Sequence, residues 1–328
     1  MNLSVIVPVH NGGADLRLCL EALAESQRGP DQVIVVDDAS TDDSGALARQ
    51  FDAQLVRLDG QPHGPAFARN RGAEMAQGQV LVFVDADVVV HPDTLDRIER
   101  CLAGHPHVSA LFGSYDDDPP GRRIVSRYKN LLHHYIHQHG RREASTFWAG
   151  CGAIRSRVFQ KVGGFDEQYE SPSIEDIELG ARLRRGGHTI LLCPEIKVTH
   201  LKRWTLKSLL MADICKRAVP WTRLMMQEGQ VPADLNLDVT SRLSAVLAWA
   251  STVSGVAGIW YRGFWVTALV ALLAVGVLNR HLYCFFVRKG GGLFAVGAAG
   301  LHFLYLLYSS AAFGITAVQT SLSASFAD

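Results

Sequence analysis

The sequence predicts an α/β domain with a mostly parallel central sheet, followed by an α-helical membrane region. Short apolar runs alternate with helix-like segments over about 110 residues, which is the pattern of βαβ units. Three of the runs end in polar side chains, at residues 10–11, 37–38 and 85–87. After Leu243 charged residues become rare, which sets the last part of the chain apart.

The predicted strands and helices alternate along the chain. Leucines at helical spacing predict the first helix, and a glycine-proline turn leads into the third. Because ligands bind beyond the carboxyl ends of parallel strands, the three polar strand ends predict one site at that edge of the sheet. The expected strands are 3–11, 31–41, 54–60 and 79–90, and the expected helices are 15–26, 42–51, 64–78 and 91–104.

The composition argues against some classes of function. The 328 residues contain 32 basic and 32 acidic side chains, and a nucleic-acid partner, which favours a basic excess, is not expected. The six cysteines form no CxxC pair, which is typical of reduced structural thiols rather than a zinc site or a disulfide framework. The N-terminal residues predict a first strand rather than a signal peptide.

Residues 241–328 predict a membrane domain. A spanning helix needs roughly 20 apolar residues, and three apolar stretches are close to that length. The segment between the last two contains Arg280, Arg288 and Lys289, and the positive-inside rule places it in the cytoplasm. We therefore expect a multi-pass protein of the cytoplasmic (inner) membrane, with the domain formed by residues 1–240 in the cytoplasm. The expected transmembrane helices are 243–260, 264–283 and 293–318.

Six segments between about residues 2 and 200 occur in the order seen in one enzyme family, the family 2 glycosyltransferases, which this part of the chain resembles. The resemblance implies the GT-A fold, with a nucleotide-sugar half at about 1–115 and an acceptor half at about 116–225. No G-x-G-x-x-G follows the first strand, which disfavours a dinucleotide-binding domain. The segments are SVIVPVHN (4–11), VVDDASTD (35–42), ARNRGA (68–73), VDADV (84–88), WAGCGAIRSRVFQKVGGFDE (148–167) and EDIELGARLRRGGH (175–188).

The resemblance implies a nucleotide-diphosphate sugar donor, with a UDP-sugar favoured, and a divalent cation, Mg²⁺ or Mn²⁺. The cation neutralises the leaving diphosphate. Asp87 is its expected direct ligand and Asp85 a secondary one. His200 either completes the metal site or has a structural role at the domain edge.

Further residues are expected at the donor by the same resemblance. Asp38 is expected to accept from the nucleotide base while Asp37 holds the loop, although spacing leaves these two roles interchangeable. Arg69 either contacts the nucleotide or diphosphate or is an ordinary surface arginine. The remaining residues expected at the nucleotide sugar are Pro8, Val9, His10, Asn11, Asp85 and Ala86.

Asp176 is the expected catalytic base of an inverting transfer, and Glu175 beside it is the second residue expected at the catalytic centre. An acceptor hydroxyl must lose its proton as it attacks the anomeric carbon, and a carboxylate takes that proton. Acidic residues are also favoured in the first turn of a helix by its dipole, and only the family resemblance favours the catalytic role. A polyprenyl phosphate is already ionised and needs no base, and a hydroxyl on a lipid or lipid-linked acceptor is therefore expected. The alternatives are a polyprenyl-phosphate glycosyltransferase and a non-catalytic membrane subunit of the same fold.

The acceptor side is expected to include residues near the middle of the chain and near the end of the soluble part. Residues 203–204 faintly resemble the end of the QxxRW motif of processive membrane synthases, but a histidine replaces the glutamine, which makes polymer synthesis less expected. The basic amphipathic stretches 122–142 and 203–226 predict either helices on the membrane surface, with 203–226 as an interfacial helix, or core helices of the domain. The expected acceptor-side residues are Trp148, Gly150, Cys151, Gly152, Arg203 and Trp204.

Overall fold

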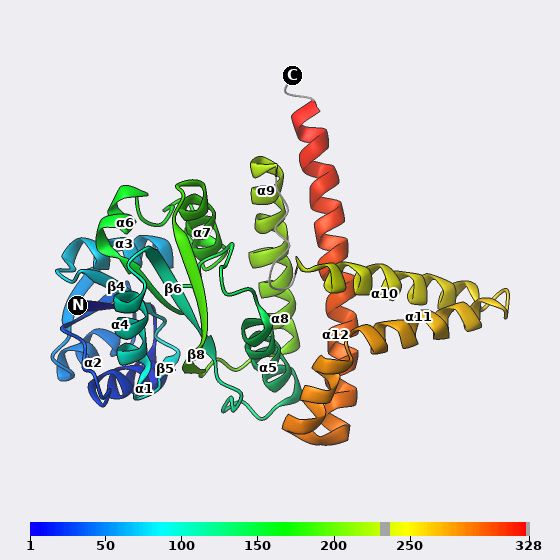
Figure 1. Cartoon of the computed structure of the whole chain (residues 1–328), viewed down its shortest axis with the longest axis horizontal. Helices are drawn as coiled ribbons and strands as arrows, with labels where there is room; N and C mark the ends of the chain where they lie inside the picture. Colours follow the sequence, from blue (N-terminus) through cyan, green and yellow to red (C-terminus); the bar gives the residue numbers. More distant parts are fainter. Residues whose placement is uncertain (230–236, 326–328) are drawn as a thin grey trace. The chain divides into compact units, whose positions relative to one another are not determined.

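The computed structural model describes residues 1–229 and 237–325 (Figure 1). The chain forms two compact units that are interleaved in sequence. The first unit consists of residues 1–121 and 137–203. The second consists of residues 122–136 and the described residues from Trp204 onward.

An eight-stranded mixed sheet lies at the centre of the first unit, in the order β3-β2-β1-β4-β7-β6-β8-β5. The pairs among β1, β2, β3 and β4 are parallel, as is β6 with β8, whereas β7 and β5 are antiparallel to their neighbours. The predicted α/β fold is confirmed, and the antiparallel pairs are an addition that the local pattern did not predict. The strands are β1 (Leu3–Val9), β2 (Gln32–Asp38), β3 (Gln54–Leu58), β4 (Val80–Val84), β5 (Val88–Val90), β6 (Val108–Tyr115), β7 (Cys151–Arg155) and β8 (Thr189–His200).

Helices cover both faces of this sheet because successive strand residues point to opposite sides. On one face Val5 and Val7 pack in a buried cluster with Leu20 of α1. On the other face the Phe83 ring lies 5.5 Å from the ring of Phe159 in α6. The helices of this unit are α1 (Gly13–Ala24), α2 (Ser44–Gln50), α3 (Pro65–Met75), α4 (Thr94–Gly104), α6 (Ser156–Lys161) and α7 (Glu175–Arg185).

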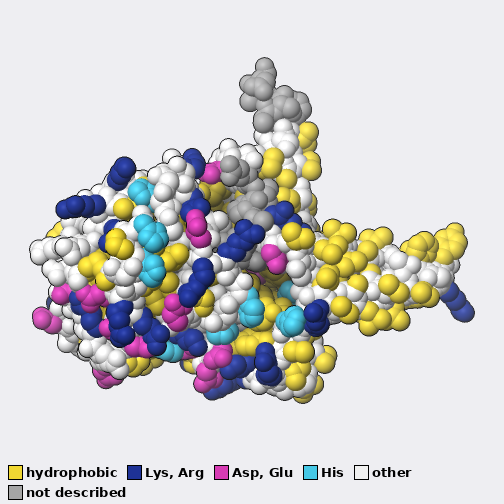
Figure 2. Space-filling model, in the orientation of Figure 1, with side chains coloured by type: hydrophobic (Ala, Val, Ile, Leu, Met, Phe, Trp, Pro, Cys, Tyr) yellow, Lys and Arg dark blue, Asp and Glu magenta, His cyan; other side chains and the backbone are white. Residues whose placement is uncertain are grey.

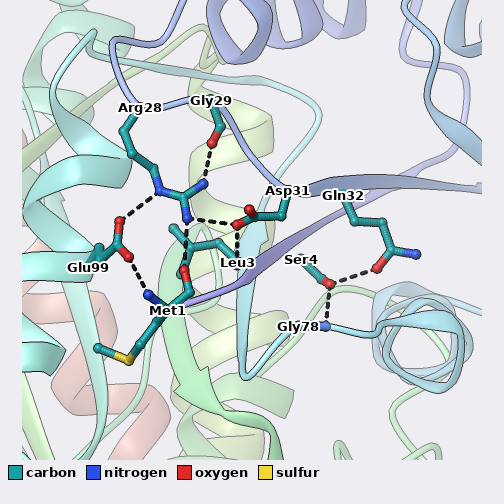
Figure 3. A network of polar contacts seen from close by, with 9 residues as sticks. All are labelled: Met1, Leu3, Ser4, Arg28, Gly29, Asp31, Gln32, Gly78 and Glu99. Carbon is teal, nitrogen blue, oxygen red and sulfur yellow. Dashed lines mark hydrogen bonds and ion pairs between the residues drawn. The ribbon is translucent and has the colours of Figure 1, made fainter.

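An ion-pair network holds the start of β1 (Figure 3). Arg28 donates to Glu99 Oε2 at 2.8 Å and to Asp31 Oδ2 at 2.7 Å, and the amino group of Met1 pairs with Glu99 at 2.5 Å. The amide of Leu3 donates to the same Asp31 oxygen at 2.7 Å. These bonds lie at the amino end of β1, opposite the end that is followed by the polar residues 10–11.

The sequence predicts a strand at 79–90 with a polar strand end at 85–87, and in the structure the strand is divided at those residues into β4 and β5. β4 ends at Val84, and the amide of Val88 donates to the carbonyl of Asp85 at 3.0 Å, which closes a tight turn before β5 begins. The side chains of Asp85 and Asp87 are about one third exposed, at 33% and 30%. The turn therefore takes both carboxylates out of the buried strand, to the polar strand end that the sequence predicts at residues 85–87.

The second unit is helical, and most of α5 (Ile124–His139) packs within it. Tyr128 and Leu131 of α5 are buried in one cluster with Phe286 of α12. Lys129 Nζ, also buried, pairs with Asp213 Oδ1 at 2.5 Å. The apolar face of α5 is thus a core face of the second unit, and the two alternatives for the stretch 122–142 stay open. The other helices are α8 (Leu206–Asp213), a π-helical turn (Ile214–Ala218), α9 (Val219–Glu228), α10 (Val239–Ala257), α11 (Phe264–Leu278) and α12 (Arg280–Ser325), which is interrupted at Gly291.

Among the described residues one helix is long and apolar enough to cross a membrane, the segment Arg280–Ser323 within α12. The three predicted transmembrane helices, and with them the multi-pass topology, are therefore not supported. α11 has 15 residues and ends at Leu278. At 1.5 Å per residue it is about 22 Å long, less than the roughly 30 Å of a bilayer core. α10 and α11 nevertheless expose many apolar side chains, which Figure 2 shows over the hairpin they form.

Candidate functional site

The loops that follow β1 and β2 are joined by hydrogen bonds. His10 Nδ1 lies 2.7 Å from the carbonyl oxygen of Asp38, and the amide of Asn11 donates to Ser40 Oγ at 2.9 Å. Asn11 and Ala39 both have positive φ, at 56° and 55°. Such conformations are uncommon for residues other than glycine, and they cluster at functional sites, where the surrounding structure holds them.

The two aspartates at the end of β2 are almost fully buried. Asp37 is 2% exposed and accepts from the amide of Ser40 at 3.0 Å, which closes the turn after the strand. Asp38 is 4% exposed and accepts from the amides of His63 at 2.9 Å and Gly64 at 2.8 Å. In the structure both carboxylates hold loops, and a contact of Asp38 with a nucleotide base stays a prediction.

The Asp87 carboxylate lies beside the end of β8. Its Oδ2 is 3.6 Å from Nε2 of His200, and the backbone of Asp87 accepts from the amide of Leu201 at 2.8 Å. Burial raises the pKa of Asp87, but the neighbouring His200 side chain and the charge of Lys202 outweigh it and lower the pKa overall. Asp87 is thus ionised at neutral pH. Ala86, between the two aspartates, packs against the core of the sheet.

Arg69 lies in the interior, with 4% of its surface exposed. Its Nη2 donates to Asp85 Oδ1 at 2.7 Å, and its Nη1 donates to Glu175 Oε1 at 2.8 Å. Burial alone lowers the pKa of Arg69, but the two carboxylates raise it overall, and the side chain stays charged. Arg69 is therefore not a surface arginine, and its direct contact with the donor stays a prediction.

Glu175 and Asp176 begin α7 but have different surroundings. Glu175 is 5% exposed, and its second oxygen accepts from the amide of Ser173 at 2.9 Å. Asp176 is half-buried, and its Oδ2 accepts from the amide of Ala149 at 3.3 Å. The carbonyl of the next residue, Gly150, accepts from the amide of Asp85 at 3.3 Å. The backbone at 149–150 therefore binds both the start of α7 and the 85–87 turn.

Three of the expected acceptor-side residues shape this backbone. A Cβ added to Gly150 would lie 2.6 Å from the ring of Trp148, and one added to Gly152 would lie 2.4 Å from the Trp148 carbonyl oxygen. Only glycine allows these approaches. Burial raises the pKa of the Cys151 thiol between them to about 12, with a contribution from the charge of Asp85, so this thiol stays protonated and unreactive at neutral pH.

Tyr115, which the sequence did not single out, belongs to an aromatic group that includes His200, the neighbour of the Asp87 side chain. The Tyr115 ring stacks on the His200 ring with centroids 4.2 Å apart and planes at 7°, and its edge meets Trp148 at 4.7 Å. His137 lies 5.1 Å from Trp148. The only signal for Tyr115 is its position as a polar aromatic residue at the end of an apolar strand, because its partners come from distant segments.

The remaining predicted residues lie in different places. Pro8 is half-buried in β1 and Val9 is buried, so both contribute to the sheet beside the first loop. Arg203 is exposed at the end of the first unit. Trp204 is buried in the core of the second unit, in one cluster with Tyr128, where it packs as a core residue.

No group of three or more histidine, cysteine or acidic side chains arranged as metal ligands occurs within residues 1–229 and 237–325. Asp87 and His200 offer one oxygen and one nitrogen donor 3.6 Å apart. Cations such as Mg²⁺ keep water and substrate phosphate oxygens as most of their ligands and need only one or two carboxylates from the protein. The donor set therefore fits a cation that is held jointly with a diphosphate.

Known proteins resemble this chain in sequence. The family model for glycosyl transferase family 2 matches residues 4–163, and that for the N-terminal domain of galactosyltransferase matches residues 130–204. An uncharacterized glycosyltransferase, YibD of Escherichia coli (strain K12), is 42% identical over 99 residues, 29% of this chain and 29% of YibD. A pre-mycofactocin glycosyltransferase of Mycobacterium tuberculosis is 31% identical over 222 residues, 63% of this chain and 44% of the relative. The chain thus spans less than half the length of these relatives.

Solved structures resemble the chain in fold. The mannosyltransferase PcManGT from Pyrobaculum calidifontis, in complex with GDP-Man and Mn²⁺, has a TM-score of 0.56 at 20% identity and covers 92% of this chain and 87% of its own. TarS 1–349 of S. aureus, in complex with UDP-GlcNAc, has a TM-score of 0.52 at 22% identity and covers 70% of this chain and 66% of its own. These likenesses show a GT-A-like fold.

Proposed function

We propose that this chain, a member of glycosyl transferase family 2 by the match of the family model to residues 4–163, transfers one sugar from a nucleotide-diphosphate sugar. The proposed acceptor is a hydroxyl of a lipid or lipid-linked molecule, and the transfer inverts the anomeric configuration. A UDP-sugar is the favoured donor. The observation that carries the proposal is the backbone at 149–150, which binds both the turn that holds Asp87 and the helix start that holds Asp176.

A divalent cation, Mg²⁺ or Mn²⁺, is the proposed cofactor; when bound, it supplies positive charge that neutralises the leaving diphosphate. Asp87 and His200 would hold it. Asp87 is ionised at neutral pH, and the Tyr115 ring fixes the plane of the His200 imidazole. A solved neighbour that contains Mn²⁺, PcManGT, supports the use of a divalent cation.

The proposed base is Asp176, which accepts the proton of the attacking hydroxyl. Its position at the start of α7 keeps the carboxylate half-exposed while the Ala149 amide orients it at 3.3 Å. A general base of this kind contributes roughly 10²–10⁴-fold to a rate. Glu175 is bonded to Arg69 and to the Ser173 amide, and we assign it a structural part at the same helix start.

The test is transfer from a panel of UDP- and GDP-sugars to lipid-linked acceptors by the full chain in detergent. Activity is expected to disappear with a chelator and in Asp87→Ala, and to fall at least 100-fold in Asp176→Asn. Asp59→Asn, which removes an exposed carboxylate after β3, is the matched control and should keep wild-type activity. Activity that survives both the chelator and Asp87→Ala defeats the proposal.

Assays with two kinds of acceptor distinguish a hydroxyl acceptor from a phosphate acceptor. A hydroxyl acceptor depends on the base, whereas an ionised polyprenyl phosphate does not. If the Asp176→Asn variant transfers sugar to a polyprenyl phosphate at the wild-type rate, the protein is a polyprenyl-phosphate glycosyltransferase. A wild-type protein that binds a nucleotide sugar but transfers nothing to either acceptor identifies a non-catalytic subunit.

The membrane is a proposed partner of residues 241–328. α12 supplies one apolar helix of sufficient length, and the α10–α11 hairpin exposes Val253, Trp260 and Leu273 at 61%, 71% and 59% (Figure 2). Large exposed apolar patches mark interaction sites. We expect the full chain to float with phosphatidylcholine vesicles and to resist extraction by carbonate. Recovery in the soluble fraction without detergent contradicts this part.

A further inference from the structure

We propose that Arg69 is a positioning residue of the transfer reaction, and this inference rests on the function proposed above. Its guanidinium ties the turn that carries Asp87 to the start of the helix that carries Asp176. It therefore acts on the two functional carboxylates through their neighbours, Asp85 and Glu175, rather than by touching the donor.

The contacts of Arg69 join parts of the chain that are far apart in sequence. Asp85 is 16 residues away and Glu175 is 106 residues away, and each carboxylate is held by a separate terminal nitrogen, at 2.7 and 2.8 Å. The side chains of Arg69 and Glu175 are only 5% and 6% exposed, so water competes little for that bond. The Asp85 side chain is 33% exposed, and its bond to Arg69 is protected on the arginine side only.

An arginine suits this position because its planar guanidinium presents several donors in a fixed fork. One end of the fork holds the 85–87 turn and the other holds α7. The aromatic ring of Phe165 lies 5.3 Å from the guanidinium carbon and limits its movement. A lysine keeps the charge but presents a single ammonium on a flexible stem, and it cannot reproduce both contacts in this geometry.

A second, weaker link joins the same two segments. The backbone at Ala149 and Gly150 donates to Asp176 Oδ2 and accepts from the amide of Asp85, both at 3.3 Å. This link explains why loss of Arg69 is expected to loosen the site without taking it apart. A misplacement of about 1 Å at a reacting group is enough to cost about 100-fold in rate.

The central experiment compares steady-state kinetics of the wild type, Arg69→Lys and Arg71→Lys. Arg71 lies on the same helix, and it binds Glu74 and Glu167 on the protein surface, which makes its variant a matched control. For Arg69→Lys we expect kcat to fall about 10- to 100-fold while KM for the donor changes less than about threefold. Arg71→Lys should retain kcat within about twofold.

Two kinetic outcomes overturn the inference. A large rise in donor KM with kcat preserved makes Arg69 a donor ligand. A kcat in Arg69→Lys within twofold of wild type shows that the double contact has no role in positioning.

A double mutant keeps the test decisive if Arg69→Lys is also less stable. Glu175→Gln keeps an oxygen that accepts from Arg69 but removes its charge, and we expect a smaller fall in kcat. Residues that act through one contact are not additive, so Arg69→Lys combined with Glu175→Gln should be little worse than Arg69→Lys alone. Multiplicative effects of the two substitutions contradict a shared role.

Hydrogen–deuterium exchange separates failure of this inference from failure of the proposed function, because it needs no activity. In Arg69→Lys the amides of the 85–88 turn and of the first turn of α7 should exchange at least about threefold faster, whereas those of α4 should not change. If the wild type transfers no sugar but exchange is faster in both segments of Arg69→Lys, the link through Arg69 is confirmed and the proposed function is wrong. If the wild type transfers sugar but exchange changes in neither segment, the link through Arg69 is refuted.

Discussion

Replacement of Gly64 by alanine is expected to destabilise the first unit more than any neighbouring glycine substitution. Gly64 precedes α3 with φ 93° and ψ 166°, a region that is essentially restricted to glycine and costs other residues about 1–3 kcal/mol. An added Cβ would also lie 2.4 Å from the carbonyl oxygen of Glu170. Backbone atoms cannot rotate away, and overpacking of this kind costs about 1–3 kcal/mol.

The two terms together predict a loss of about 4 kcal/mol in the free energy of unfolding. For a unit of this size each 1 kcal/mol lowers Tm by about 2–4 °C, which gives a fall of about 8–16 °C. The Gly64 amide also donates to Asp38 Oδ2 at 2.8 Å, and binding of a nucleotide sugar should weaken in the same variant. Thermal unfolding of the full chain in detergent, followed by circular dichroism, measures the stability.

Two other glycines separate the backbone strain from the clash. Gly60 has nearly the same φ, 89°, but a Cβ there meets nothing within 4 Å, so Gly60→Ala should cost only the strain, about 1–3 kcal/mol. Gly104 has open space and no positive φ, and its alanine variant should change stability by less than about 0.5 kcal/mol. A Tm for Gly64→Ala equal to that for Gly60→Ala refutes the predicted clash with the backbone.

Three further predictions address other parts of the chain. Lys129→Met should destabilise the second unit by about 3–5 kcal/mol because it leaves the buried Asp213 carboxylate unpaired, and replacing both residues with apolar ones should restore most of the loss in a denaturation assay. The hydrogen bond with Cys193 lowers the pKa of Cys101 to about 6, so its rate of alkylation by iodoacetamide should be half-maximal near pH 6, and a midpoint near pH 9 contradicts this. Arg28→Ala should cost about 1 kcal/mol or less at pH 7 because its partners are partly exposed. The pKa values of those two carboxylates are lowered in the folded protein, so the difference from wild type should shrink as the pH falls below about 4.

Local pattern predicts the parallel strands β1 to β4 because the strands and helices of these βαβ units follow one another directly in the sequence. It does not predict the parallel pair of β6 and β8. The polar ends of β1, β2 and β4 follow from the same pattern. The antiparallel strand β7 does not, since the residues that pair with it in β4 and β6 lie well before it in the chain. The turn after Val84 was missed for a related reason: apolar residues on both sides of the aspartates look like one continuous strand.

The candidate site was predictable as a set of motifs but not as a set of contacts. Aspartates and glutamates at strand and helix ends are visible in the sequence. The stacking of Tyr115 on His200 is not, because their pairing depends on strands that are adjacent only in the folded sheet. The burial of Arg69 is equally invisible, since the residues around it on α3 show no strong apolar face.

The acidic residues of the site occur as close pairs, and the contacts of Arg69 suggest why. In the 85–87 turn one carboxylate, Asp85, is bound to Arg69, and in the first turn of α7 one carboxylate, Glu175, is bound to the same side chain. The other member of each pair, Asp87 or Asp176, is the one for which we propose a chemical role. A buried arginine needs opposite charges nearby, because an uncompensated charge in the interior is costly. Asp85 and Glu175 therefore supply the charge that keeps Arg69 in place between the two segments, and their replacement should weaken catalysis even though neither residue itself reacts.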